Sequence, residues 1–260
     1  MRMKVISLAP DLTEILGELD LLSSLAGISA TCSLPGSSET IHVVSEGNQL
    51  FIDQILSLKP ELILNSGNRH TTWTQLCLEA GLPVLHLQPK SILSVPEHLI
   101  HIGRLMGVEA VAVEKAKSWI TEFKALQYQG ARDVNRVTGY IEFGSESYQQ
   151  PPVWAHQLLD AAGITPLFPS GNEPDFFSRI HFDAAFLVSG NPVTSVSELK
   201  TMADRRNKEA GGYKWHEESC YALPENQITV CGPHLLDGLR ALIRIRAGIE
   251  ARGPVINQLD

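Results

Sequence analysis

The residues that could carry chemistry are polar and aromatic side chains that follow the predicted strands. Ligand sites of α/β sheets lie outside the carboxyl ends of the strands, so residues at these ends are the first candidates. In the first half of the chain they are Pro10, Asp11, Thr31, Cys32, Glu46, Asn48, Arg69 and His70. In the second half they are Phe143, Tyr148, Trp154 and Trp215. One such set in each half predicts a ligand-binding cleft between two lobes.

Local catalytic motifs are absent from the sequence. It contains no GxxxxGK[ST], no GxGxxG after a strand, no GxSxG and no HExxH, and no spacing ties Ser, His and Asp into a triad. Their absence removes the local evidence for an enzyme but does not exclude one, because many catalytic sites have no signature in the sequence; we assign no catalytic residue. The alternative is an intracellular, hydrolase-like enzyme that uses the same cleft. Its nucleophile would be Ser145 or Cys32, activated by His70.

Metal binding is the second alternative. His70, His216 and Glu46 could converge on a metal ion if their loops meet. The acidic residues, however, show no DxD-like cluster. We expect no metal site and no intrinsic cofactor.

The tryptophans and two helical histidines have both functional and packing interpretations. Trp154 could stack on a large flat ligand, or it could pack between a helix and the sheet. Trp215 follows two glycines, which indicates a residue exposed on a lid. For Trp119, in the middle of a predicted helix, we expect packing. For His98 and His101, on one helix, we expect surface positions.

The elements that must position these residues alternate between short apolar runs and helical patterns. The first half predicts strands at 5–8, 25–28, 41–44, 61–64 and 83–87, and helices at 11–19, 51–58, 71–80 and 91–107. The second half predicts strands at 136–142, 182–188, 221–223 and 228–230, and helices at 153–162, 195–207 and 235–249. Strands that alternate with helices in this way predict α/β layers with mainly parallel sheets.

One long helix separates the two halves. Apolar residues keep helical spacing through 109–131, which would make a rod of ~35 Å at 1.5 Å per residue. The predicted organisation is therefore an amino-terminal α/β lobe at 1–107, a bridging helix at 108–132 and a carboxy-terminal α/β lobe at 133–260.

Composition narrows the class of partner and the compartment. The 260 residues carry a net charge of −8, which disfavours nucleic acid, and no apolar run is long enough to span a bilayer. The four cysteines form no CxxC or regular framework, which favours reduced thiols. The predicted strand at 5–8 follows so soon after Met1 that there is no room for a signal peptide, so we expect a cytoplasmic location. We also expect a monomer. A periplasmic location is the alternative if a signal sequence was removed or missed.

Four segments resemble one family. Residues 5–16 (VISLAPDLTEIL), 52–64 (IDQILSLKPELIL) and 232–239 (GPHLLDGL) are similar to the opening strand and helix, a central segment and the terminal helix of periplasmic binding proteins of ABC transporters. The class concerned binds cobalamin, haem and iron–siderophores. Residues 151–163 (PPVWAHQLLDAAG) resemble the tryptophan-containing helix of its cobalamin-binding members.

The resemblance implies non-catalytic capture of cobalamin, or of another metal chelate such as haem or an iron–siderophore, between the lobes. The chelate would be a ligand and not a cofactor. In this family each lobe presents a carboxylate to arginines of the ABC permease. Asp53 matches the first-lobe position, where Glu is usual, and the second-lobe position has no match between 177 and 188. A cytoplasmic homologue is the alternative setting for the same binding function.

Overall fold

The computed structural model describes two compact units, each of which is an α/β layer. The described residues are 3–34, 41–67, 71–132, 137–143, 151–168, 183–189, 200–201, 203–204, 207–208 and 219–252. Unit 1 comprises Met1–Thr121 together with Val230–Pro233, and unit 2 comprises Glu122–Thr229 together with His234–Asp260. The first boundary falls inside helix α5 (Glu109–Ala131), where the sequence analysis placed a separate connector.

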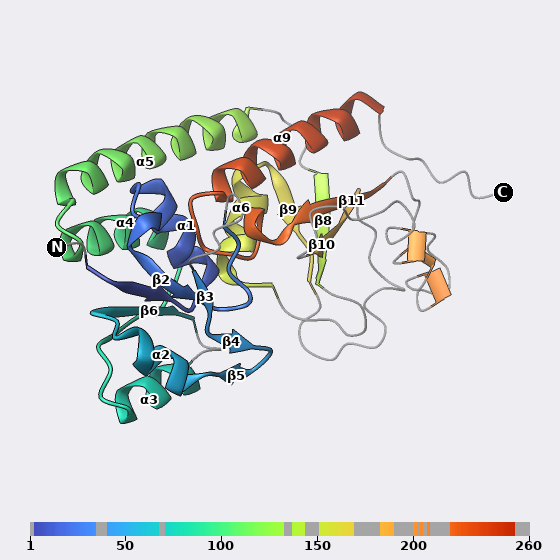
Figure 1. Ribbon diagram of the computed structural model, residues 1–260. Helices are drawn as coiled ribbons and strands as arrows, with labels where there is room; N and C mark the ends of the chain where they lie inside the picture. The colour runs from blue at the N-terminus through green and yellow to red at the C-terminus, as the bar shows by residue number, and fades with distance from the viewer. Residues whose placement is uncertain are drawn as a thin grey trace. The chain divides into compact units, whose positions relative to one another are not determined.

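Unit 1 is built on a five-stranded parallel sheet in the order β3-β2-β1-β6-β7. Its strands are β1 (Val5–Ser7), β2 (Leu25–Ile28), β3 (His42–Val43), β6 (Leu62–Ser66) and β7 (Val84–Leu87). Its helices are α1 (Pro10–Glu18), α2 (Ile52–Leu58), α3 (Thr71–Glu79) and α4 (Ser94–Leu105). Helices α1 and α4 cover one face of the sheet, and α2 and α3 cover the other (Figure 1).

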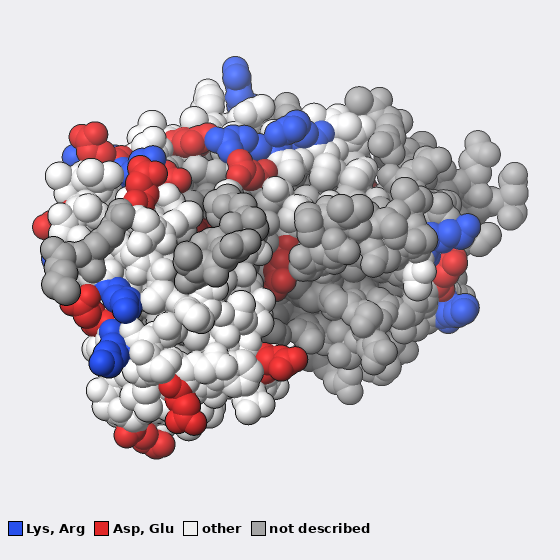
Figure 2. Space-filling model, in the orientation of Figure 1, with Lys and Arg blue, Asp and Glu red and all other residues white. Residues whose placement is uncertain are grey.

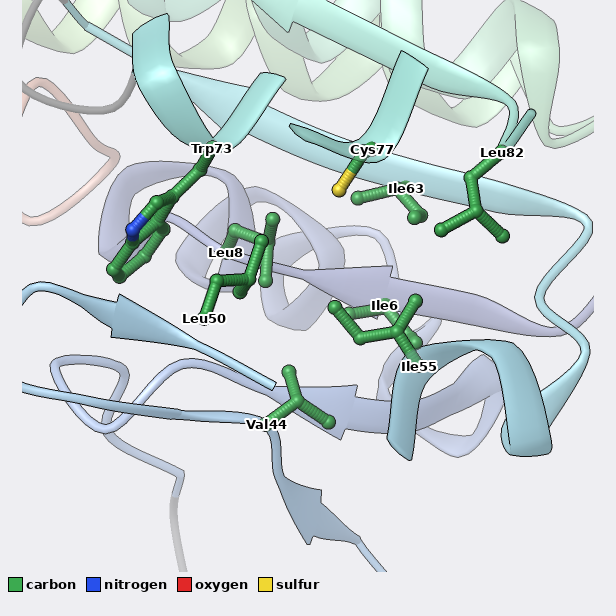
Figure 3. Packing of buried hydrophobic residues seen from close by; sticks show 9 residues of the cluster. All are labelled: Ile6, Leu8, Val44, Leu50, Ile55, Ile63, Trp73, Cys77 and Leu82. Atoms are coloured by element: carbon green, nitrogen blue, oxygen red, sulfur yellow. The ribbon is translucent and has the colours of Figure 1, made fainter. Parts of the chain in front are cut away.

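The alternation of side chains along the first strand connects the sheet to both helical layers. Ile6 belongs to a buried cluster that includes Ile55 of α2 and Cys77 of α3 (Figure 3). Ser7 faces the other way, and its hydroxyl accepts a hydrogen bond from Thr13 Oγ1 of α1 at 2.8 Å. Because successive residues of a strand point to opposite faces, one short strand supplies apolar packing to one layer and a polar anchor to the other.

Unit 2 contains a four-stranded parallel sheet in the order β11-β10-β8-β9. The strands are β8 (Val137–Phe143), β9 (Ile164–Pro166), β10 (Ala184–Ser189) and β11 (Cys220–Pro224). Helix α6 (Val153–Ala161) packs against β9 and against the terminal helix α9 (Leu235–Arg252).

Within unit 1, helix α5 is held by close packing, an ion pair and a hydrogen bond. Gly103 of α4 lies so close to Ala112 that a Cβ on Gly103 would collide with the alanine methyl. Lys115 Nζ lies 2.9 Å from Glu18 Oε1 of α1. Trp119 is only 5% exposed, as its predicted packing role requires, and its indole nitrogen donates to a backbone carbonyl. Charged side chains of both signs gather over α5 in Figure 2.

Within unit 2, the end of α5 is held by a buried arginine. Arg246 of α9 is 2% exposed, and its Nη1 donates to the carbonyl of Gly130 in α5 and, at 2.9 Å, to that of Ala162. The last carbonyls of a helix lack partners inside the helix and carry partial negative charge, so a cation is stabilising there. Gly163 has a φ of +77°, and a Cβ at this position would collide with the Arg246 guanidinium.

The sequence-based elements agree with the structure except at a few short segments. A strand at 228–230 is wrong: these residues form a turn after the 3₁₀ helix Glu225–Gln227, because Thr229 N–H bonds back to the Glu225 carbonyl at 2.8 Å. The sequence analysis did not predict β9 or the hairpin of β4 (Ser45–Glu46) and β5 (Gln49–Leu50). Most of the helix predicted at 195–207 lies outside the described residues. Among the described residues, no helix is long and apolar enough to cross a membrane.

Candidate functional site

A buried polar layer lies at the carboxyl edge of the unit 1 sheet. Ser7 ends β1, Ser66 ends β6, and Ser29 follows β2, and all three serines are buried. The backbone N–H of Ser29 donates to the Ser7 carbonyl at 3.0 Å, which extends the pairing of β1 with β2 by one residue. Three neighbouring strands therefore end in hydroxyl side chains at the edge where ligands of α/β sheets bind.

Asp11, a predicted ligand-binding residue, lies inside this layer. It is the second residue of α1 after Pro10, is 6% exposed, and its Oδ2 accepts a hydrogen bond from Ser66 Oγ at 2.6 Å. Burial raises the pKa of Asp11 to about 6, and the bonds from Ser66 and the backbone counteract this rise in part. In this structure the Asp11 carboxylate is therefore buried inside unit 1, where it accepts the hydrogen bond from Ser66.

Thr31 and Cys32 form the loop after β2. Ser29 Oγ lies 2.9 Å from Thr31 Oγ1 and 3.1 Å from Cys32 Sγ. Cys32 Sγ also donates to the Ser7 carbonyl at 3.7 Å, and burial raises the pKa of the thiol. Thr31 is exposed, whereas Cys32 is a half-buried, protonated thiol and a poor nucleophile in this setting.

Glu46 and Asn48 lie on the β4–β5 hairpin, and both side chains are exposed. The hairpin is joined to the loop after β2, because the Ala30 N–H donates to Ser45 Oγ at 3.0 Å. Trp73 Nε1 holds its turn by donating to the Asn48 carbonyl at 3.0 Å. Thr31, Glu46 and Asn48 thus share one exposed rim of unit 1, which we call the unit 1 rim.

The other predicted site residues do not belong to the unit 1 rim or the buried polar layer as the structure describes them. Arg69, His70, Tyr148 and Trp215 lie outside the described residues, as do Ser145, His216 and the side chain of Phe143. Asp53 is exposed in the first turn of α2. Trp154 is half-buried, and its Nε1 donates to the Thr229 carbonyl at 3.0 Å; its role in ligand binding stays a prediction.

In the described part of the chain, no group of three or more His, Cys, Asp or Glu side chains could hold a metal ion.

The prediction of a surface position for His98 is wrong. His98 is 7% exposed because Val95, Leu99 and Ile102 turn the same side of α4 toward the core. Among the described residues its Nδ1 has no hydrogen-bond partner, and burial, helped by nearby His101, lowers the pKa of His98 to about 4. His101 is exposed, as predicted.

Sequence reasoning missed a chain of polar side chains inside unit 1. Asn65 Nδ2 donates to Thr74 Oγ1 at 2.8 Å, and Thr74 Oγ1 lies 2.6 Å from His86 Nδ1. Asn65 Oδ1 also accepts the Ser66 N–H at 3.0 Å, so the chain reaches the residue that bonds to Asp11. The available signal was the polar residues inside two mainly apolar strands, Asn65 and Ser66 in LILNS and His86 in VLHL.

Comparison with known proteins assigns the chain to a family. Residues 5–193 match the model of the periplasmic binding proteins. The chain belongs to the periplasmic binding protein family. This family consists of non-catalytic ligand-binding proteins that serve ABC import, so the resemblance and the non-enzymatic class that the sequence analysis predicted are confirmed.

The chain is similar to curated vitamin B12-binding proteins of two bacteria. The chain is 26% identical over 176 residues to the vitamin B12-binding protein of Pectobacterium carotovorum, covering 66% of this chain and 63% of that protein. It is 27% identical over 145 residues to the vitamin B12-binding protein of Yersinia pestis, covering 55% of this chain and 51% of that one. The chain therefore spans between half and two thirds of the length of these curated relatives.

Solved structures establish the fold. The periplasmic vitamin B12 binding protein BtuF of Vibrio cholerae superposes with a TM-score of 0.75 at 17% identity, over 95% of this chain and 97% of that chain. A periplasmic heme binding protein of Pseudomonas aeruginosa reaches 0.79 at 16% identity, over 94% and 92%. The predicted fold class, two parallel α/β sheets with one long helix, is confirmed.

Proposed function

We propose that this chain binds a metal chelate of the cobalamin class and presents it to an ABC permease. The observation that carries the proposal is the 176-residue match to a vitamin B12-binding protein. The unit 1 rim supports it, because Thr31, Glu46 and Asn48 offer hydroxyl, carboxylate and amide groups at the edge where α/β folds bind ligands. The amide side chains of a corrin ring can hydrogen-bond to each of these groups.

The first experiment is a titration of the purified chain with cyanocobalamin, haemin and ferrichrome. Calorimetry gives the stoichiometry, and quenching of tryptophan fluorescence gives an independent affinity. We expect one cobalamin per chain with micromolar or tighter affinity. Tight binding of haemin or ferrichrome in place of cobalamin would overturn the choice of ligand, and no binding of any of the three would overturn the whole proposal.

A second experiment tests the unit 1 rim. Glu46→Gln removes a charge from the rim, whereas Glu79→Gln removes one from the exposed surface of α3 and serves as the matched control. A hydrogen bond to a charged group contributes ~1.5–3 kcal/mol, so we expect Glu46→Gln to weaken cobalamin binding roughly tenfold or more. Equal affinities of the two variants would remove Glu46 from the site.

Asp53 is the proposed docking residue. Its carboxylate is exposed in the first turn of α2 and is available for a charge-assisted bond to an arginine of a partner. With a vitamin B12-type ABC permease in lipid nanodiscs, Asp53→Asn should weaken complex formation and leave cobalamin affinity unchanged. Glu79→Gln is again the control, and equal capture of all three proteins would exclude Asp53 from docking.

A cytoplasmic carrier of the same ligand is the second candidate. All four cysteines are free thiols, three of them buried, which favours a reducing compartment. For this second candidate we propose a cytoplasmic location. Fractionation of cells that express the complete gene tests it: recovery with a cytosolic marker supports the carrier, and recovery from the periplasm supports the importer component.

A further inference from the structure

The β4–β5 hairpin carries Glu46 and Asn48 of the unit 1 rim, but it is too short to hold its own shape. Each of its two strands has two residues. A two-stranded hairpin is at best marginally stable in water when nothing else supports it. The orientation of these two rim side chains therefore depends on contacts that reach the hairpin from the rest of unit 1.

The first strand of the hairpin is bonded to β2 and the loop that follows it. The Val44 N–H, directly before β4, donates to the Ile28 carbonyl at 2.9 Å. The Ala30 N–H donates to Ser45 Oγ at 3.0 Å. Both bonds lie at the base of the hairpin. The turn at its tip begins at Gly47, whose φ of +53° lies in the left-handed region that favours glycine.

The turn is held from helix α3. Trp73 Nε1 donates to the Asn48 carbonyl at 3.0 Å. Trp73 is 4% exposed and belongs to the same buried cluster as Leu50, the last residue of β5 (Figure 3). Because packing fixes the ring, the indole N–H stands in one place and stabilises the turn conformation whose carbonyl meets it.

The position of Trp73 is fixed by the residue that follows it. Thr74 Oγ1 accepts a hydrogen bond from Asn65 Nδ2 of β6 at 2.8 Å and lies 2.6 Å from His86 Nδ1 of β7. The beginning of α3 is thus bonded to two strands of the sheet. Since Thr74 is adjacent to Trp73, these bonds also hold the backbone from which the indole extends.

We propose that Trp73 is a positioning residue of the ligand site, which holds Glu46 and Asn48 in one orientation before the ligand binds. The inference rests on the function proposed above, because that function assigns both side chains to the ligand. A turn that becomes ordered only on binding would lose conformational entropy at that moment, and a turn that is already ordered avoids this loss. Trp73 is buried and acts through the hairpin rather than by touching the ligand.

The test removes the indole N–H and keeps an aromatic ring. Trp73→Phe deletes the bond to the Asn48 carbonyl. Trp119→Phe is the matched control, because Trp119 is 5% exposed and its Nε1 donates to a backbone carbonyl outside the hairpin, that of Pro233, at 3.2 Å. Mass spectrometry would measure amide hydrogen exchange of peptide 44–51 in the ligand-free protein, and calorimetry would measure the affinity for cyanocobalamin.

A second variant separates the hydrogen bond from the packing of the ring. Site-specific incorporation of 3-benzothienylalanine at position 73 keeps two fused rings and puts sulfur in the place of the indole N–H. This variant replaces Trp73→Phe if that protein fails to fold, and the same substitution at position 119 is then its control.

We expect Trp73→Phe to speed exchange of peptide 44–51 about fivefold and to weaken cyanocobalamin binding by a similar factor, which corresponds to one hydrogen bond of about 1 kcal/mol. Trp119→Phe should change neither. Unchanged exchange in a folded variant, equal changes in the control, or faster exchange with unchanged affinity would overturn the proposal. If the wild-type protein bound no cyanocobalamin, the proposed function would fail instead, and the exchange rates, which need no ligand, would still decide whether Trp73 holds the hairpin.

Discussion

The Asp11→Asn substitution should stabilise unit 1 at neutral pH. The buried Asp11 carboxyl has a pKa of about 6, compared with 3.8 for a free aspartate, mainly because burial disfavours the charged form. Each pKa unit corresponds to ~1.36 kcal/mol, so ionisation of Asp11 costs the folded state about 3 kcal/mol at pH 7 and above. Asparagine is neutral, and its Oδ1 can still accept the Ser66 hydroxyl that Asp11 Oδ2 accepts.

The sign of the pH dependence follows from the direction of this pKa change. Because the folded-state pKa of Asp11 is the higher one, the folded state takes up the proton first as the pH falls, and the destabilisation is relieved between about pH 6 and pH 4. The advantage of Asp11→Asn should thus be largest, up to about 3 kcal/mol, near pH 7.5 and vanish near pH 4.

His98 contributes the opposite slope in the same pH range. Its folded-state pKa of about 4 lies below the ordinary 6.5, so the unfolded chain binds the proton first and stability falls as the pH drops through this interval. The pH profile of the wild-type protein therefore mixes two opposed contributions. The difference between wild type and Asp11→Asn isolates Asp11, because His98 is the same in both.

Urea unfolding between pH 4 and pH 7.5, followed by the fluorescence of Trp73 and Trp119, measures this difference in unit 1. Asp53→Asn is the control: it neutralises an exposed carboxylate and should change the unfolding free energy by less than ~0.5 kcal/mol. If Asp11→Asn were less stable than wild type at pH 7.5, the Ser66 bond to a charged carboxylate would outweigh burial, and our account of Asp11 would be refuted.

Three further predictions concern packing and thiols. Arg246→Met should lower the stability of unit 2 by about 3 kcal/mol in urea unfolding, because it leaves the carbonyls of Gly130 and Ala162 without their charged donor. Arg246→Lys should restore only part of the lost stability. Gly103→Val should lower the Tm, since the new side chain collides with Ala112, and an unchanged Tm would show that α4 and α5 separate easily. A thiol assay without reductant should count four thiols in denaturant, with Cys32 reacting first in the native protein because it alone is only half-buried.

The identity and order of most elements could be predicted from the sequence alone. Apolar runs of strand length and helical spacing are local signals, and the helix predicted at 109–131 has the observed bounds Glu109–Ala131. The local signal was insufficient for β4, β5 and β9, which are only two or three residues long. Their pairing depends on neighbours, such as the hydroxyl of Ser45 that receives the Ala30 N–H.

The candidate site, too, could be predicted from the sequence only in part. The sequence indicated which loops follow the strands, and the structure joins two of these loops in the unit 1 rim with Thr31 and Glu46. Only the tertiary structure shows that Asp11 is buried against Ser66, that His98 faces the core, and that Trp119 bonds to Pro233. The partners in these two bonds lie 55 and 114 residues apart. Residue type and spacing determine what a segment can form, whereas burial and hydrogen bonding depend on which distant segment covers it, and that is decided when the chain packs.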